Sequence, residues 1–241
     1  MSITLYAFPT APGFFNGSPY CGKVDILFKM AGIDFTTEMP EDYKVFSKGK
    51  LPVIKDGDAI IQDSEIIRYH LAETYGHSLD EGLSAEAKAT GHAVCRMLDD
   101  RSVLGLVWSR WVEDEGWAQT KQIFFEGDPT GEGEVVRGNI REGLTGAGFG
   151  LHSEEEQRRF IKEDIDAIAA LLGDREWFLS DTPTYLDATV FSFIANFYGS
   201  PIRTWIAPLV AAHDNLVAYF ERGMARWYPE GLKMLQQTAA E

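Results

Sequence analysis

The sequence is poor in cysteine: among its 241 residues only Cys21 and Cys95 carry a thiol. Two cysteines so far apart do not make a disulfide framework, and they supply none of the paired ligand spacings that tetrahedral zinc sites use. We therefore expect no structural metal and a reducing environment such as the cytoplasm.

Basic side chains are also scarce. The chain carries 22 lysines and arginines against 37 acidic residues, which gives a formal net charge of −15 at pH 7. Such a charge repels phosphate backbones and anionic lipid surfaces at long range, so nucleic acid is not an expected partner. A small anionic ligand is still compatible, because a helix N-terminus can bind a carboxylate locally.

Long apolar runs are missing as well. The first residues, MSITLYAFPT, contain no extended hydrophobic stretch, and the first basic residue is Lys23. This pattern argues against secretory and mitochondrial targeting and against a membrane span, so a cytoplasmic location is expected.

The first 76 residues alternate between strand and helix patterns. Five segments are expected in order: a strand at residues 3–8, a helix at residues 19–31, a strand at residues 33–39, a hairpin around the Asp56-Gly57 turn, and a helix over residues 63–76. A βαβ unit followed by a ββα unit is the arrangement of a thioredoxin-like domain, which we predict for residues 1–79.

The rest of the chain has helical periodicity. From Ser84 onward no convincing strand alternation is present, so residues 84–241 are predicted to form an all-helical bundle domain. Two glycine-rich passages, EGDPTGEGE and GLTGAGFGLHS, are interpreted as loops or bends. The predicted fold class is thus α+β, with a thioredoxin-like α/β domain followed by an all-α domain.

The stretch NGSPYCGKV places Ser18 and Cys21 at the start of the first predicted helix. Its proline and cysteine have the spacing of a thiol-handling site, but a serine stands where a first thiol would be. Three interpretations are open: a disarmed disulfide motif, a hydroxyl-based active site, and a simple helix start. Cys21, one turn into the helix, has the properties of a packed and inert thiol.

Two further segments carry candidate binding residues. Leu51 and Pro52 open a predicted strand. In a thioredoxin-like unit this proline would be cis, and Leu51 would offer its backbone to an extended peptide. A proline that simply starts a strand explains the pattern equally well. Asp63 and Ser64 are good helix N-caps, yet a first-turn serine and an aspartate also match the carboxylate and the amine of an amino-acid headgroup.

Taken together, the segments SPYCGKVDILFKMAGIDF, KGKLPVIKDGDAIIQDSEIIRYHLAETYG and PTYLDATVFSFIA resemble the glutathione S-transferase superfamily, and the resemblance covers nearly the whole chain. The long loop PTAPGFFNG and the segment SRWVEDEGW more closely resemble the branch that includes failed axon connections proteins and metaxins.

The resemblance implies a glutathione site in the first domain and a pocket for an acceptor substrate lined by the helical domain. Leu51 and Pro52 would bind the cysteinyl backbone of glutathione. Asp63 and Ser64 would hold its γ-glutamyl end, and Lys50 its glycyl carboxylate. The partners implied are glutathione and a small hydrophobic electrophile, and the family usually forms a homodimer.

In the same resemblance Ser18 faces the glutathione sulfur. Its hydroxyl would donate a hydrogen bond to the thiolate, and the helix dipole would favour the same anion, so that glutathione itself attacks the electrophile. Tyr6, at the end of the first strand, is an alternative hydroxyl. Trp108 and Trp111 either line the acceptor pocket or belong to the helical core.

Two alternatives to a transferase remain. Not all relatives in the failed axon connections and metaxin branch are established enzymes, so the chain is also interpretable as a binding or scaffold protein that keeps the fold without turnover. The third hypothesis is a glutathione-dependent thiol oxidoreductase, in which an exposed Cys21 forms a mixed disulfide with glutathione.

Overall fold

The computed structural model describes residues 3–10 and 14–240, with the backbone alone for residues 238–240. Part of the long loop predicted before the first helix, residues 11–13, lies outside this range. The chain forms two compact units. The sheet unit comprises Met1–His92, Arg175–Asn196 and Ala218–Glu241, and the helical unit comprises Ala93–Asp174 and Phe197–Val217.

A four-stranded sheet organises the sheet unit. Its strands are β1 (Ile3–Tyr6), β2 (Phe35–Glu38), β3 (Val53–Asp56) and β4 (Ala59–Gln62), in the spatial order β2-β1-β3-β4. Strand β1 runs parallel to β2 and antiparallel to β3, and β3 runs antiparallel to β4. This is the mixed sheet expected of a thioredoxin-like fold, which confirms the sequence-based prediction.

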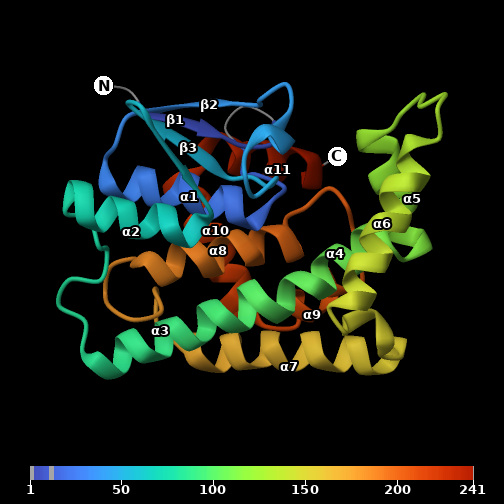
Figure 1. Cartoon of the computed structure of the whole chain (residues 1–241). Helices are drawn as coiled ribbons and strands as arrows, with labels where there is room; N and C mark the ends of the chain where they lie inside the picture. The colour runs from blue at the N-terminus through green and yellow to red at the C-terminus, as the bar shows by residue number, and fades with distance from the viewer. Residues whose placement is uncertain (1–2, 11–13, 241) are drawn as a thin grey trace. The chain divides into compact units, whose positions relative to one another are not determined.

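Helices α1 (Pro19–Ala31) and α2 (Ser64–Tyr75) lie along the same face of this sheet in Figure 1. Each ends at a glycine in the left-handed conformation, Gly32 with φ 64° and Gly76 with φ 74°. A positive φ is favourable only for glycine at such a stop. Val24, Ile26, Leu27 and Phe28 of α1 are fully buried, so the helix is held in a fixed place relative to the sheet.

Later helices complete the sheet unit. Most of α8 (Tyr185–Tyr198) and α10 (Asp214–Trp227), together with α11 (Pro229–Ala240), belong to it. Tyr228 donates a hydrogen bond of 2.5 Å to Asp25 on α1, and Lys29 forms an ion pair of 2.7 Å with the same carboxylate. The C-terminal helices are therefore anchored directly to α1.

The helical unit begins near the end of α3 (Ala85–Met97). It continues through a π-helical turn, η2 (Leu98–Ser102), into α4 (Val103–Trp111), and then contains α5 (Asp114–Phe124), α6 (Glu132–Gly146), the 3-10 turn η3 (Phe149–Leu151), α7 (Glu154–Leu172) and α9 (Ile206–Ala211). The α-helical region after the sheet is as predicted. Among the described residues, none of the helices combines the length and apolar character needed to cross a membrane.

The prediction for the glycine-rich passages is wrong in part, because α6 starts inside the first passage and ends inside the second. Contacts made by the helix explain why it forms despite its glycines. Arg137 and Arg141 both donate hydrogen bonds to the carbonyl oxygen of Val112, at 2.6 and 3.2 Å. Gly133 lies so close to Phe125 that a Cβ would approach that ring to 3.0 Å.

The predicted domain boundary, between residues 79 and 84, divides the chain at a single point in the sequence and stays a prediction. The two compact units group the chain differently, because segments 175–196 and 218–241 pack with the sheet.

Candidate functional site

Ser18 is the N-cap of α1. Its backbone is extended, with φ −99° and ψ 120°, and its hydroxyl oxygen accepts a hydrogen bond of 3.4 Å from the Cys21 amide. A serine hydroxyl has one proton and two acceptor lone pairs, so this contact leaves the proton available for a second partner. The side chain is half-buried. Ser18 therefore places a hydrogen-bond donor at the positive end of a helix.

Asn16 fixes the approach to this helix. Its side-chain nitrogen donates to the carbonyl oxygen of Phe8 at 2.7 Å, and its side-chain oxygen accepts from the Ser18 amide at 2.9 Å. Its own carbonyl oxygen accepts from the side chain of Asn196 on α8 at 3.0 Å. Sequence reasoning missed this residue, although an asparagine two positions before an N-cap is typical of an Asx turn.

Cys21 is fully buried. Burial raises the pKa of its thiol to about 11, and the hydrogen bond from Ser18 offsets only part of this shift. A thiol in this environment is neither accessible nor ionised near neutral pH. The exposed Cys21 that the oxidoreductase hypothesis requires is absent, and Cys21 is a packing residue.

Leu51 and Pro52 lie at the entrance of β3. The peptide bond between them is cis, as predicted for a thioredoxin-like unit, and both side chains are buried. The carbonyl oxygen of Pro52 accepts a hydrogen bond of 3.3 Å from the Asp63 amide. This contact brings two of the segments predicted from the sequence side by side.

Asp63 is the N-cap of α2. Its carboxylate accepts hydrogen bonds from the amides of Glu65 and Ile66, at 2.9 and 3.3 Å. Its φ of 90° is unusual for a residue other than glycine. Such a backbone costs on the order of 1–3 kcal/mol and tends to be retained at functional positions. Ser64, the next residue, is buried at the first turn of the helix.

Lys50, the residue predicted to meet a glycyl carboxylate, has an exposed side chain. Its neighbour Lys48 is held more firmly: its amide donates to the side chain of Gln62 at 3.0 Å, and its ammonium donates to the Gln62 carbonyl at 3.1 Å. Lys48 is thus held against Gln62, which is the last residue of β4 and directly precedes Asp63. No pattern in the sequence distinguishes Lys48 from Lys50.

Tyr6, the alternative hydroxyl, is half-buried at the end of β1. Its ring packs against Phe46, with 5.5 Å between the centroids. This contact is the ordinary packing of an aromatic residue at the end of a strand.

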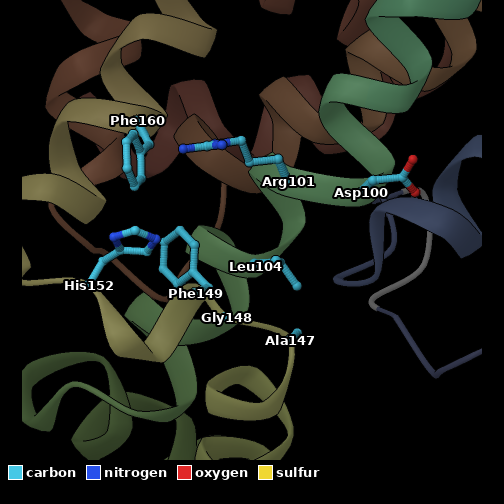
Figure 2. Close-up of a pocket in the computed structure, with 8 residues that line it drawn as sticks. All are labelled: Asp100, Arg101, Leu104, Ala147, Gly148, Phe149, His152 and Phe160. Carbon is cyan, nitrogen blue, oxygen red and sulfur yellow. The ribbon is translucent and has the colours of Figure 1, made fainter.

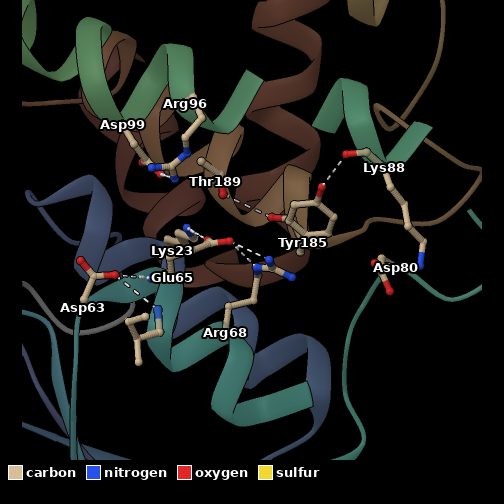
Figure 3. A network of polar contacts seen from close by, with 11 residues as sticks. Lys23, Asp63, Glu65, Arg68, Asp80, Lys88, Arg96, Asp99, Tyr185 and Thr189 are labelled. Atoms are coloured by element: carbon tan, nitrogen blue, oxygen red, sulfur yellow. Dashed lines mark hydrogen bonds and ion pairs between the residues drawn. The ribbon is translucent and has the colours of Figure 1, made fainter. Parts of the chain in front are cut away.

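A buried ionic network joins α1 to the first turn of α2 (Figure 3). The Lys23 ammonium lies 2.7 Å from one carboxylate oxygen of Glu65, and its side chain is only 1% exposed. Arg68 donates two hydrogen bonds, of 2.9 and 2.6 Å, to the other oxygen of the same carboxylate. The Arg68 guanidinium also lies over the ring of Tyr185, 4.6 Å from its centroid.

The electrostatics of this network are dominated by Glu65. Its burial alone raises the pKa of the carboxyl, but the charge of Lys23 and the hydrogen bonds from Arg68 and Lys23 outweigh burial and lower that pKa to about 2. Glu65 is therefore ionised at neutral pH, and the network connects the helix that carries Ser18 to the helix that carries Ser64. Sequence reasoning missed all three residues, because lysine and glutamate on two helices carry no readable pairing signal.

Trp108 and Trp111 are both half-buried on α4, in the helical unit. The ring of Trp108 packs against Phe149, with centroids 6.2 Å apart, and Trp111 stacks on Phe124 at 5.7 Å. These contacts fit a core role within the helical unit. Their assignment to an acceptor pocket stays a prediction.

The described residues contain no group of three histidine, cysteine, aspartate or glutamate side chains arranged to hold a metal ion. The chemistry that the sheet unit offers is instead a hydroxyl donor at one helix N-terminus, a cis-proline backbone, and an aspartate and a serine at a second helix N-terminus. Together these groups suit a small peptide with a free amine, carboxylates and an ionisable group.

Comparison with protein-family models gives two matches. Residues 19–116 match the glutathione S-transferase N-terminal domain, and residues 161–223 match the glutathione S-transferase C-terminal domain.

Curated relatives are of two kinds. An isoprene-epoxide glutathione S-transferase of Rhodococcus sp. is 31% identical over 230 residues, covering 91% of this chain and 97% of that protein. Failed axon connections of Drosophila melanogaster is 26% identical, covering 95% of this chain and 58% of that protein. Human metaxin-1 is also 26% identical, covering 75% of this chain and 41% of its own length.

Solved structures agree on the fold. A glutathione S-transferase of Rhodospirillum rubrum superposes with a TM-score of 0.60 at 18% identity, covering 92% of this chain and 87% of that one. A glutathione S-transferase of Methylobacterium radiotolerans in complex with glutathione sulfonate gives a TM-score of 0.58 at 20% identity, covering 96% and 95%.

Proposed function

This chain belongs to the glutathione S-transferase superfamily, and we propose that it conjugates glutathione to a small hydrophobic electrophile. The observation that carries the proposal is the position of Ser18, whose hydroxyl oxygen caps α1 and whose proton is not used by the cap. The same hydroxyl is hydrogen-bonded to the buried Cys21 thiol, a weak acceptor that a ligand thiolate can replace. A hydroxyl in this place stabilises a thiolate by donating to it.

In the proposed complex the γ-glutamyl end of glutathione lies at the first turn of α2. The Ser64 hydroxyl and the amides of that turn bind its carboxylate, and Asp63 pairs with its amine. The backbone at Leu51 and Pro52 binds the cysteinyl part of the tripeptide. Lys48 and Lys50 are the two cations available to its glycyl carboxylate.

The chemical step is a nucleophilic attack by glutathione. The thiol loses its proton to solvent, and the thiolate is held by the Ser18 hydroxyl and by the positive end of α1. One curated relative is named for an isoprene epoxide, and an epoxide is the acceptor we propose. The sulfur then forms a bond to a ring carbon, the carbon–oxygen bond breaks, and the alkoxide takes a proton from water.

The decisive experiment compares Ser18→Ala with the unmodified protein. Loss of one hydrogen bond to an anion should raise the pKa of bound glutathione thiol by about 1–2 units and slow conjugation roughly 100-fold. Thiolate absorbance across a pH series measures the first effect, and the rate with a small aliphatic epoxide measures the second. An unchanged thiol pKa in Ser18→Ala would remove the serine from the mechanism.

Ser153→Ala is the matched control, because Ser153 caps α7 with the same hydroxyl-to-amide geometry. It should cost about the same 1 kcal/mol of stability as loss of the Ser18 cap, without moving the thiol pKa. Ser64→Ala should weaken glutathione binding in calorimetry, because a carboxylate partner is lost.

The second candidate function is binding without turnover, as a scaffold. It is supported by the similarity to failed axon connections and the metaxins. Calorimetry with glutathione separates the two functions: a folded protein that releases no heat with glutathione favours the scaffold. We further propose that the chain acts in the cytoplasm as a homodimer, which sedimentation at micromolar concentration and imaging of the tagged protein test.

A further inference from the structure

A cavity of about 250 Å³ lies within the helical unit (Figure 2). Leu104 on α4, the loop from Ala147 to Phe149, and Phe160 on α7 supply its apolar walls, and Asp100, Arg101 and His152 supply its polar groups. Figure 2 shows the Arg101 guanidinium above the space that Phe149, His152 and Phe160 enclose. The cavity shares no residue with the candidate glutathione site.

The backbone that presents Arg101 is the π-helical turn η2. Single π-helical turns inside α-helices occur frequently at functional sites. Hydrogen bonds of a residue within the turn hold its conformation. The Ser102 hydroxyl lies 3.2 Å from the carbonyl oxygen of Met97 and donates to the Asp164 carboxylate at 2.6 Å. Arg101 therefore projects from a turn whose conformation is anchored.

The charge of Arg101 acts on the Asp164 carboxylate and lowers the pKa of that group against the effect of burial, but no ion pair within 4.0 Å joins Arg101 to a carboxylate of the described residues. The guanidinium carbon of Arg101 lies over the Phe160 ring, 3.9 Å from the centroid. A cation–π contact with a ring face forms no conventional hydrogen bond, so the N–H donors of the guanidinium can still bind a ligand.

The acidic groups around the cavity are committed elsewhere. Asp100 lies 3.5 Å from the Arg96 guanidinium. Glu156 accepts a hydrogen bond of 2.8 Å from the Ser153 amide in a capping box, and Asp164 accepts the Ser102 hydroxyl. None of these carboxylates accepts a hydrogen bond from Arg101, so the N–H donors of Arg101 are the groups that can hold an anionic ligand.

We propose that this cavity binds a small aromatic carboxylate. The carboxylate would take the edge of the Arg101 guanidinium in a two-bond contact, which is the geometry that arginine favours. The ring of the ligand would lie between Leu104 and Phe149, with the edges of His152 and Phe160 beside it. The volume is below the 300–1,000 Å³ typical of pockets for drug-sized ligands, so the ligand is of the size of benzoate.

The test titrates benzoate into the full-length protein in buffer of low ionic strength. Trp108 reports occupancy, because its ring packs against Phe149 in the cavity wall, with centroids 6.2 Å apart. Benzamide, a neutral molecule of the same shape, measures the contribution of charge. We expect benzoate to bind with a millimolar Kd and at least tenfold more tightly than benzamide.

Arg101→Gln should abolish that tenfold preference. The matched control is Arg159→Gln, which removes an exposed α7 arginine paired with Glu163 and should leave the preference intact. Circular dichroism establishes that both variants keep their helix content. Equal binding of benzoate and benzamide, no saturable benzoate binding below about 10 mM, or an unchanged preference in Arg101→Gln overturns the proposal. None of these results depends on glutathione binding or turnover.

Discussion

Replacing Glu65 with glutamine removes the central charge of the network between α1 and α2 while keeping the shape of the side chain. The carboxylate is bonded to Lys23 at 2.7 Å and to Arg68 at 2.6 and 2.9 Å. The variant takes the Glu65 carboxylate charge away from the buried Lys23 ammonium. We expect Glu65→Gln to have a lower free energy of unfolding than the unmodified protein at neutral pH, and we expect the size of this difference to depend on pH.

The magnitude follows from the pKa of Glu65. In the folded protein burial raises this pKa, but the neighbouring cations lower it by more than burial raises it. The pKa of Glu65 is therefore about 2, against an ordinary value of 4.5. Each pKa unit corresponds to about 1.4 kcal/mol, so the ionised carboxylate contributes about 3 kcal/mol to stability. Because the folded pKa is depressed, this contribution is complete above pH 4.5 and is lost as the pH falls toward 2.

Urea unfolding followed by tryptophan fluorescence measures the effect at pH 7 and at pH 3. Glu65→Gln should be about 3 kcal/mol less stable than the unmodified protein at pH 7, and the difference should shrink by more than half at pH 3. Glu163→Gln is the control, since its pair with Arg159 is exposed and should be worth less than about 1 kcal/mol.

The reasoning would be refuted by a difference between Glu65→Gln and the unmodified protein that is equally large at pH 3 and pH 7. Such a result would mean that the lost contribution is packing or a neutral hydrogen bond. A difference below 1 kcal/mol at pH 7 would mean that the cost of burying the ions cancels their attraction.

Three further outcomes are expected. Cys21 and Cys95, both buried, should resist alkylation by iodoacetamide at pH 8 in the native protein and react fully in guanidinium chloride, as followed by intact mass. Gly116→Ala should lower the free energy of unfolding by about 1–3 kcal/mol or more, because the added Cβ would clash with the backbone of α4. Gly138→Ala on α6 should instead raise the free energy of unfolding by about 0.5–1 kcal/mol, because no atom lies within 4 Å of the added Cβ. Tyr228→Phe loses a buried hydrogen bond to a carboxylate on α1 and should cost about 1.5–3 kcal/mol in urea unfolding.

Local signals predicted the sheet unit well. The Asp56-Gly57 turn, the stops at Gly32 and Gly76, and the N-caps at Ser18 and Asp63 each act within a few residues, and all appear in the structure. Such features depend on backbone conformation that one or two residues determine. They are therefore readable without knowledge of the tertiary contacts.

Features that depend on distant contacts were not predictable in the same way. Helix α6 forms although it contains four glycines after its first residue, since arginines on it bond to the end of α4. The π-helical turn at residues 98–102 interrupts a sequence that reads as one continuous helix. The pairing of Lys23 with Glu65 joins residues 42 positions apart, and no short-range pattern encodes it.

The contrast between Ser18 and Cys21 shows why motif spacing alone left the chemistry open. The two residues lie one turn apart on the same helix start, and both carry groups that a glutathione site can use. Burial separates them: Cys21 faces the core, where its thiol pKa is raised to about 11, whereas Ser18 is half-buried and keeps its hydroxyl proton uncommitted to the cap. The hydrogen bond from the Cys21 amide also restrains the position of the Ser18 oxygen, so the hydroxyl group is in place before any ligand arrives. A hydroxyl placed in this way can stabilise a thiolate supplied by a ligand, but it cannot itself form a disulfide, and this favours conjugation over thiol exchange.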